Sequence, residues 1–117
     1  MSDLIISVSG LRGRIGAGLD ASVATEFARA YGTFLGGGKV IVGRDSRPSG
    51  AMLAHAVMAG LASTGCDPID IGLSATPTTG LLVRQLGAAG GVEVTASHNP
   101  ADWNGVKLFH KDGRALN

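Results

Sequence analysis

The sequence predicts an α/β fold: a three-layer α/β/α domain with a mixed, mostly parallel four-stranded sheet, one antiparallel edge strand and an additional amino-terminal strand. Short β-branched and apolar runs alternate along the chain with longer stretches of helical periodicity. Most of the 19 glycines lie at the ends of the apolar runs, where strands and helices need short connections. With 117 residues, 44% of them apolar, the chain is long enough for one domain, 1–117, with a buried core.

Composition narrows the class of protein. The formal net charge is +1, which indicates neither a nucleic-acid-binding nor a membrane surface, and no apolar stretch is long enough to span a bilayer. Cys66 is the only cysteine, so an internal disulfide is excluded and a reducing compartment is favoured. The acidic start, Met1–Asp3, lacks the basic and apolar segments of a signal peptide. We therefore expect a cytoplasmic protein.

The first third of the chain is expected to contain a strand, a loop and a helix. Leu4–Val8 is a short β-branched run, and Ser9–Gly16 is a glycine-spaced segment that we interpret as a loop with two arginines. This loop matches neither a dinucleotide-binding fingerprint nor a P-loop. Asp20 or Ser22 can cap a helix that runs to about Leu35, where three glycines end it. Five residues at helical spacing form its expected buried stripe: Val23, Phe27, Tyr31, Phe34 and Leu35.

A continuous apolar run, Val40–Val42, is typical of a strand buried on both faces. It leads into the polar loop Gly43–Gly50, in which we expect Arg44 to pair with Asp45. The next helix is expected over about Gly50–Thr64, with a glycine following it. Its inner face is expected to consist of Met52, Leu53, Ala56, Val57, Gly60 and Leu61.

Two strands enclose a shorter helix before the chain returns. Pro68–Gly72 reads as a strand, and Thr76 can cap a helix that has Pro77 at its first position. The next strand is Gly91–Thr95, and the last is Gly105–Phe109. The connection between these two is too short for a right-handed parallel crossover with its helix, so we expect the last strand to run antiparallel. The apolar side of the short helix is expected to be Leu81, Leu82, Val83 and Leu86.

Polar residues collect where one strand ends and the next begins. Thr95–Pro100 has the sequence TASHNP, and Asn104–Lys107 follows with NGVK. A loop at the carboxyl end of a strand is the usual ligand site in an open α/β sheet. Here Ser97 offers a hydroxyl, His98 an imidazole and Lys107 an ammonium group. This set suits phosphate chemistry, which needs a nucleophilic oxygen, hydrogen-bond donors and positive charge.

These two segments resemble the active-site loop of the α-D-phosphohexomutases, the family that includes phosphoglucomutase, phosphomannomutase and phosphoglucosamine mutase. Ser9–Gly13 is similar to the family's G-[IL]-R-G motif, although Ser7–Ser9 replaces the aromatic-glycine-threonine run common before it. Gly43–Arg47 resembles the family's G-R-D-[ST]-R segment. The resemblance covers nearly the whole chain but only most of the first of the family's four domains. It implies that the later domains are absent from this chain.

The resemblance also implies roles for individual residues. Ser97 would carry the transferable phosphoryl group, with Arg12 and Lys107 balancing its charge. His98 would orient the loop or contact phosphate, and Arg47 would line the cleft or support the loop. Two amides would fix the geometry of the loop: Asn99 and Asn104.

In a complete enzyme of this family, the resemblance implies a two-step phosphoryl transfer. Phosphorylated Ser97 would give its phosphoryl group to a hexose phosphate, and the resulting bisphosphate would reorient and return its other phosphate. The phosphate of the sugar would thereby move between positions 1 and 6. Mg²⁺ would bind through the phosphate on the serine, but the aspartate ligands of the family's second domain are missing here. We therefore expect the isolated chain to be inactive.

Two other functions remain open. The chain could act as a non-catalytic folded module, and sheet edges or faces normally covered by later segments could pair two copies into a homodimer. It could also be a serine acyl hydrolase in which His98 is the base for Ser97. Adjacent residues after a strand point in different directions, and no third member of a triad is evident, so the sequence favours this hydrolase least.

Overall fold

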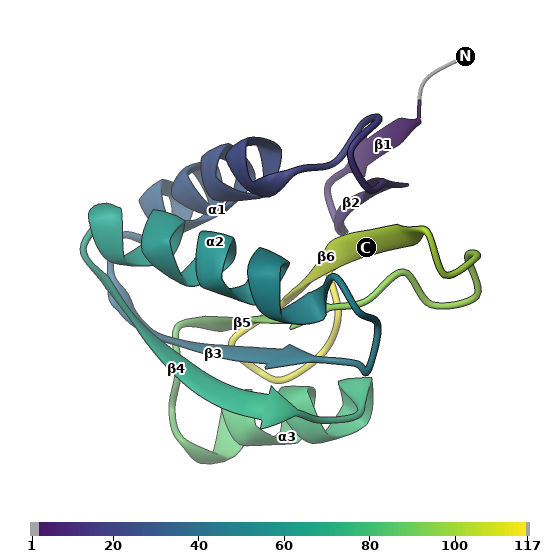
Figure 1. Cartoon of the computed structure of the whole chain (residues 1–117). Helices are drawn as coiled ribbons and strands as arrows, with labels where there is room; N and C mark the ends of the chain where they lie inside the picture. The colour runs from purple at the N-terminus through teal and green to yellow at the C-terminus, as the bar shows by residue number, and fades with distance from the viewer. Residues whose placement is uncertain (1–2, 117) are drawn as a thin grey trace.

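The computed structural model describes residues 3–116, and within this range the chain forms six strands and three helices (Figure 1). In chain order they are β1 (Leu4–Ser7), β2 (Gly10–Arg14), α1 (Ala21–Leu35), β3 (Gly38–Arg44), α2 (Gly50–Ser63), β4 (Cys66–Leu73), α3 (Thr76–Gln85), β5 (Gly90–Val94) and β6 (Trp103–Phe109).

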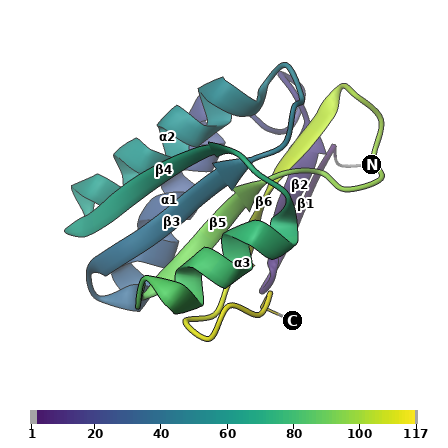
Figure 2. The same cartoon turned by 90° about the horizontal axis from the view of Figure 1, so that it is seen from below.

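The strands form one mixed sheet in the order β1-β2-β6-β5-β3-β4. β3 is parallel to both of its neighbours, β4 and β5, whereas β6 runs antiparallel to β5 and to β2. β1 and β2 form an antiparallel hairpin that completes the other side of the sheet. Helices α1 and α2 lie on one face and α3 on the other (Figures 1 and 2). The predicted α/β/α class with a mixed sheet and an antiparallel final strand is therefore confirmed.

The interpretation of Ser9–Gly16 as a loop was wrong, because most of it is strand β2. Leu11 and Gly13 are buried, whereas the arginines that follow each of them are exposed. This period-two pattern is that of a strand, and the glycine spacing obscured it. Because β2 pairs with β6, β6 is not an edge strand, and the edges are β1 and β4. The sheet has six strands rather than four, and three of its five pairings are antiparallel, so it is not mostly parallel.

Helix α1 begins as predicted, and four of the five residues of its predicted stripe lie in the core or pack against it. The Oδ1 atom of Asp20 accepts a hydrogen bond from the backbone N–H of Val23 at 2.9 Å, which satisfies a donor of the first turn. Tyr31 belongs to the core, where its hydroxyl donates to the carbonyl of Phe109 at 2.7 Å. The predicted stripe fails at Phe34, which is 80% exposed. The residues that α1 buries are mostly small: Ala24, Ala28, Tyr31 and Gly32.

Small residues also set the contact between α1 and α2. At Gly60 an added Cβ would lie 2.5 Å from the backbone oxygen of Thr25 and 2.9 Å from the Cβ of Ala28. The two helices therefore approach at a distance that only glycine permits. Met52, predicted to face inward, is 38% exposed because the buried face of α2 is centred on other positions. These buried residues are Gly50, Leu53, Ala54, Ala56, Val57, Gly60 and Leu61.

Helix α3 begins one residue earlier than predicted, since Ala75 rather than Thr76 occupies the N-cap position. Its Val83 is buried, but Leu81 and Leu86 of the expected apolar side are 42% and 46% exposed. The helix packs on β3 and β5, and its buried Gly80 also lies against Phe109 of β6 and the backbone of Gly113.

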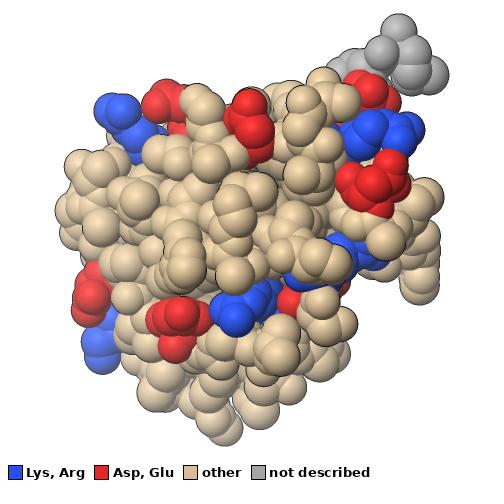
Figure 3. Space-filling model, viewed as in Figure 1, with Lys and Arg blue, Asp and Glu red and all other residues tan. Residues whose placement is uncertain are grey.

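The surface of the molecule is relevant to the expected absence of a membrane span and to the expected pairing of two copies. None of the helices within residues 3–116 is long and apolar enough to cross a membrane. Acidic and basic side chains are interspersed on the face shown in Figure 3. The edge strand β1 and the turn after it expose Ile5, Ile6 and Val8. Self-association through such an edge stays a prediction, as does the absence of nucleic-acid and membrane partners.

Replacing Gly60 by alanine is expected to destabilise the fold, although alanine is favoured over glycine inside a helix by about 1 kcal/mol. The added methyl group would force α1 and α2 apart, since its nearest neighbours are backbone and Cβ atoms of α1. We expect a net loss of about 1–2 kcal/mol in the free energy of unfolding, measured by urea denaturation. The control is Ala59→Ser at the exposed neighbouring position, with an expected change within about 0.5 kcal/mol. A Gly60→Ala protein as stable as the parent would contradict this close approach.

Candidate functional site

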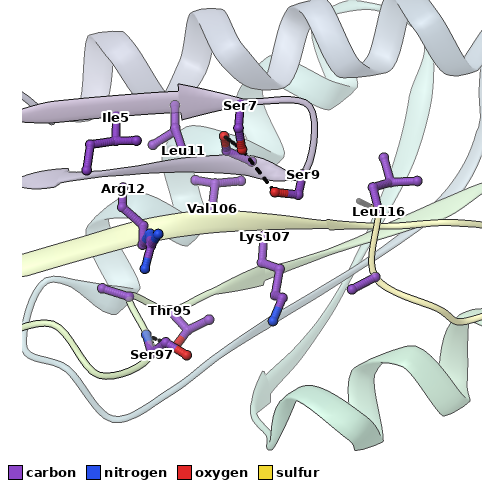
Figure 4. A pocket seen from close by; sticks show the side chains of 13 residues that line it. Ile5, Ser7, Ser9, Leu11, Arg12, Thr95, Ser97, Val106, Lys107 and Leu116 are labelled. Carbon is purple, nitrogen blue, oxygen red and sulfur yellow. Dashed lines mark hydrogen bonds between the residues drawn. The ribbon is translucent and has the colours of Figure 1, made fainter.

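A cleft of about 330 Å³ lies where β1, β2 and β6 meet the loop after β5 (Figure 4). Its sheet residues can be assigned to a face from the strand register. Lys107 is paired with Glu93 on one side and with Gly10 on the other, and residues paired across antiparallel strands share a face. Arg12 lies two residues after Gly10 and so shares it too. Glu93 contacts Thr79 of α3, so the basic side chains of the cleft project from the face that α3 covers elsewhere.

Among the described residues, the lining of the cleft combines apolar side chains with hydroxyl groups and two cations and includes no acidic side chain. Figure 4 shows Arg12 and Lys107 projecting from β2 and β6 to the side of the cleft where Ser97 lies. These three residues, which the sequence assigned to one site, therefore meet in space although they come from three different segments. The hydroxyl-bearing residues of the lining are Ser7, Ser9, Thr95 and Ser97.

Ser97 occupies a tight turn directly beyond β5. Its side chain is exposed, and its backbone has a φ of 58°, in the left-handed region that residues with a Cβ rarely adopt. The backbone N–H of Ser97 donates to Oγ1 of Thr95 at 3.1 Å, and that of Asn99 donates to the carbonyl of Ala96 at 3.1 Å. The turn thus presents the serine hydroxyl at the surface of the cleft with no helix or strand covering it.

One neighbouring carboxyl group interacts with the cations of the cleft, because the charge of Lys107 acts on the buried Glu93, its partner in the register of β5 and β6. Within residues 3–116, no ion pair involves Arg12 or Lys107, whereas the exposed Arg14 pairs with Asp102 at 2.5 Å. Arg12 instead donates to the amide oxygen of Asn99 at 3.2 Å, which leaves its charge intact. Two cations that form no ion pair within the described residues, beside several hydroxyl donors, make this cleft suited to an anion such as a phosphate group.

Arg47 lies beneath the serine loop rather than in the cleft. Its Nη2 atom donates to the carbonyls of Ser97 and Asn99, both at 2.9 Å, and its Nη1 donates to those of Pro100 and Trp103 at 2.7 and 3.0 Å. The side chain is only 14% exposed. Because these contacts occupy both of its terminal nitrogens, Arg47 holds the loop and has no terminal donor directed at the cleft.

The expected pairing of Arg44 with Asp45 is wrong. Asp45 pairs instead with Arg47, with 3.4 Å between the carboxylate Oδ2 and the Nε atom, and its Oδ1 accepts from the backbone N–H of Arg47 at 3.1 Å. The carboxylate therefore turns toward the serine loop and not back along β3. Sequence adjacency gave no way to choose between the two arginines.

His98 and Asn104 are not part of the cleft lining. His98 is exposed, and no hydrogen bond in the described part of the chain joins it to Ser97, so the geometry of an acyl hydrolase is not formed. Asn104 is fully buried: its Nδ2 donates to Oγ of Ser49 at 2.8 Å, and its Oδ1 accepts from the N–H of Gly105 at 2.8 Å. Asn104 thus ties the start of β6 to the start of α2.

A buried carboxyl group lies next to the cleft, and the sequence analysis did not single it out. Glu93 is 1% exposed, and its Oε1 accepts hydrogen bonds from Thr79 at 2.5 Å and Ser74 at 3.5 Å. An added Cβ at Gly43 would collide with all three side chains, so this glycine makes room for the cluster. Burial, assisted by the negative charge of Asp45, raises the pKa of Glu93 to about 7. The sequence did contain a signal for this buried carboxyl, because Glu93 is an acidic residue inside an otherwise apolar strand.

The side chains of the cleft do not by themselves form a magnesium site. Mg²⁺ prefers oxygen ligands and usually takes one or two carboxylates, whereas this lining combines hydroxyls with two cations. Over the described range 3–116, no three His, Cys, Asp or Glu residues are grouped closely enough to hold a metal ion. We therefore derive no step that depends on a metal ion held by this chain.

A family model described as "Phosphoglucomutase/phosphomannomutase, alpha/beta/alpha domain I" matches residues 4–117. The chain belongs to this family. The fold agrees at the structural level: a crystal structure of a phosphomannomutase homologue from Thermus thermophilus superimposes with a TM-score of 0.89 at 36% identity, covering 99% of this chain and 28% of that one. A "Phosphoglucomutase/phosphomannomutase family protein" from Burkholderia thailandensis gives a TM-score of 0.82 at 35% identity, covering 92% of this chain and 26% of that one.

Curated relatives in the phosphohexomutase family carry a narrower name. A "Probable phosphoglucosamine mutase" from Thermococcus kodakarensis is 48% identical over 107 residues, which is 92% of this chain and 24% of the relative. The "Phosphoglucosamine mutase" from Parasynechococcus marenigrum is 46% identical over 108 residues, or 92% of this chain and 23% of the relative. The chain thus spans about a quarter of the length of the curated relatives it matches.

Glu93 should make stability depend on pH. Its pKa is about 7 in the folded chain, against an ordinary value of 4.5. Between these values the folded state holds a proton that the unfolded state releases, so stability is full below about pH 4.5 and falls as the pH rises through 7. The loss would be on the order of 3 kcal/mol, since one pKa unit corresponds to about 1.4 kcal/mol.

Glu93→Gln tests this, because glutamine fills the same space and cannot ionise. Relative to the parent, the variant should gain stability between pH 4.5 and pH 8 in urea denaturation. The control is Glu26→Gln on the exposed side of α1, for which the difference from the parent should be nearly the same at both pH values. If the Glu93→Gln difference also stayed constant, the buried carboxyl would not titrate as inferred.

Proposed function

We propose that this chain provides the phosphoryl-carrying serine of a hexose-phosphate mutase. The observation that carries the proposal is the exposed Ser97 on the rim of a cleft whose two cations, Arg12 and Lys107, form no ion pair within the described residues. Membership of the phosphohexomutase family supports this reading of the cleft. The relatives' names cover both amino and neutral hexoses, so the proposed substrate class is a hexose phosphate.

In the proposed reaction, Ser97 alternates between a phosphate ester and a free hydroxyl. A sugar hydroxyl attacks the phosphorus, the bond from phosphorus to Oγ of Ser97 breaks, and the proton lost by the sugar is matched by one gained by the serine. The reverse transfer from the other phosphate of the bisphosphate completes the shift between positions 1 and 6. Arg12 and Lys107 would stabilise charge on the phosphoryl oxygens in both directions, because such transfers depend mainly on positioning and electrostatics.

Magnesium belongs to the proposal only for the longer protein. The side chains described in this chain do not form a Mg²⁺ site, so a metal ion would have to be held mainly by groups outside it. Lewis-acid assistance to the phosphoryl group is the chemistry that such an ion would supply. The binding contribution of this chain would then be the phosphate on Ser97.

The isolated chain is expected to show no mutase turnover. The cleft lies at an open face and offers contacts for the phosphoryl group, but the chain covers only about a quarter of the relatives that carry the enzyme name. A coupled assay for conversion of a hexose 1-phosphate to the 6-phosphate, with Mg²⁺ and a trace of hexose bisphosphate, measures this. Turnover that scales with chain concentration and persists through repeated purification would reject the expectation.

A chimera can test the role of Ser97 in a complete enzyme. In it, residues 4–117 replace the matching segment of the Parasynechococcus marenigrum phosphoglucosamine mutase. Ser97→Ala is expected to lower kcat at least about 1000-fold, because the variant has no oxygen to carry the phosphoryl group. The control is Ser22→Ala at an exposed position near the start of α1, with kcat expected within twofold of the unmutated chimera. A Ser97→Ala chimera of undiminished kcat would refute the proposal.

A further inference from the structure

We propose that Asp45, Arg47 and Thr95 act together as a positioning unit that holds Ser97 in its left-handed backbone conformation, and hence its hydroxyl at the cleft. The inference rests on the function proposed above and extends it from the loop contacts of Arg47 to a joint role with Asp45 and Thr95. Its basis is a closed ring of interactions that begins and ends on the backbone of Ser97.

The ring can be followed from the serine N–H to the serine carbonyl. The N–H of Ser97 donates to Oγ1 of Thr95 at 3.1 Å, and the Thr95 hydroxyl donates to Oδ2 of Asp45 at 2.7 Å. The same Oδ2 lies 3.4 Å from Nε of Arg47, whose Nη2 donates to the carbonyl of Ser97 at 2.9 Å. Both backbone polar groups of the serine are therefore fixed by one connected network.

Asp45 is itself held in place by the sheet. Its backbone N–H donates to the carbonyl of Val94, the last residue of β5, at 3.1 Å, and its Oδ1 accepts from the N–H of Arg47 at 3.1 Å. The carboxylate thus has a fixed position relative to the strand from which the serine loop departs. The network transmits the geometry of the parallel β3–β5 pair to Ser97.

The backbone of Ser97 needs such a network. A φ of 58° is costly for a residue with a Cβ, and among residues 3–116 Ser97 is the one non-glycine residue with positive φ. A strained conformation persists only when its surroundings determine it, and here a guanidinium with four carbonyl acceptors and a bridging carboxylate do so.

These residues act through Ser97 and not on the phosphate itself. Both terminal nitrogens of Arg47 are engaged by loop carbonyls, so they are not available to bind an anion. A carboxylate at Asp45 facing a phosphate would repel it, and its two oxygens are instead engaged by Thr95 and Arg47. We therefore class them as positioning residues.

The first test measures the loop in the chain as it stands. Arg47→Ala should increase water–amide hydrogen exchange at Ser97 and Asn99 at least tenfold by NMR. Arg44→Lys, in the same segment, should leave the exchange unchanged. Thr95→Val, which keeps the shape of the side chain but removes the hydroxyl, should increase the exchange at Ser97 and provides the test if Arg47→Ala does not fold. Exchange at Ser97 as slow as in the parent in a folded variant would overturn the proposal.

The second test measures catalysis in the chimera. Arg47→Lys should lower kcat about 10- to 100-fold with KM within threefold, because one ammonium nitrogen cannot replace a fork that reaches four carbonyls. In Arg47→Ala, free guanidinium should restore part of the lost kcat, whereas ammonium at the same ionic strength should not. Unchanged kcat in both variants would overturn the proposal.

Amide exchange in the chain and kcat of the chimera together distinguish a failure of this inference from a failure of the function it rests on. If the Ser97→Ala chimera remained fully active, the proposed function would fail, while the exchange measurement would still decide whether the network holds the loop. If Ser97→Ala were inactive but the Arg47 variants kept the parental kcat, only the positioning role would fail.

Discussion

The cleft depends on the place of β6 in the sheet. β6 pairs antiparallel with β5 on one side and with β2 on the other, and these pairings are formed by backbone hydrogen bonds that no side chain can replace. One of them brings Lys107 beside the strand that delivers Ser97, and the other brings it beside the strand that carries Arg12. Three segments far apart in the sequence therefore form one cleft only when β6 lies in register between them.

Where the sequence carried a local physical signal, the fold could be predicted well. Capping chemistry gave Asp20 as one of two candidate caps, and periodicity and connection length predicted the core position of Tyr31 and the antiparallel return of the last strand. Strand β2 was not predicted, because its glycines are typical of a loop and its partner β6 lies near the other end of the chain. Phe34 and Met52 were misplaced because α1 and α2 meet through small residues, so their large side chains point outward.

The site could be predicted only in part. Motifs identified Ser97, Arg12 and Lys107, and the structure places all three around one cleft. The partner of Asp45 and the buried environment of Glu93 depend on which atoms face each other across strands β3, β5 and the start of α3. Spacing along the chain indicates which residues of one strand share a face. It does not indicate which residues of another strand or helix lie opposite them.

The two cations of the cleft project from neighbouring strands, whose backbones are held about 4.8 Å apart by the ladder between them. This pairing fixes the positions from which the side chains of Arg12 and Lys107 extend. An anion can therefore contact both side chains only while β2 and β6 remain paired. Anion binding and the cohesion of the β2–β6 pair are for this reason thermodynamically linked, and each should strengthen the other.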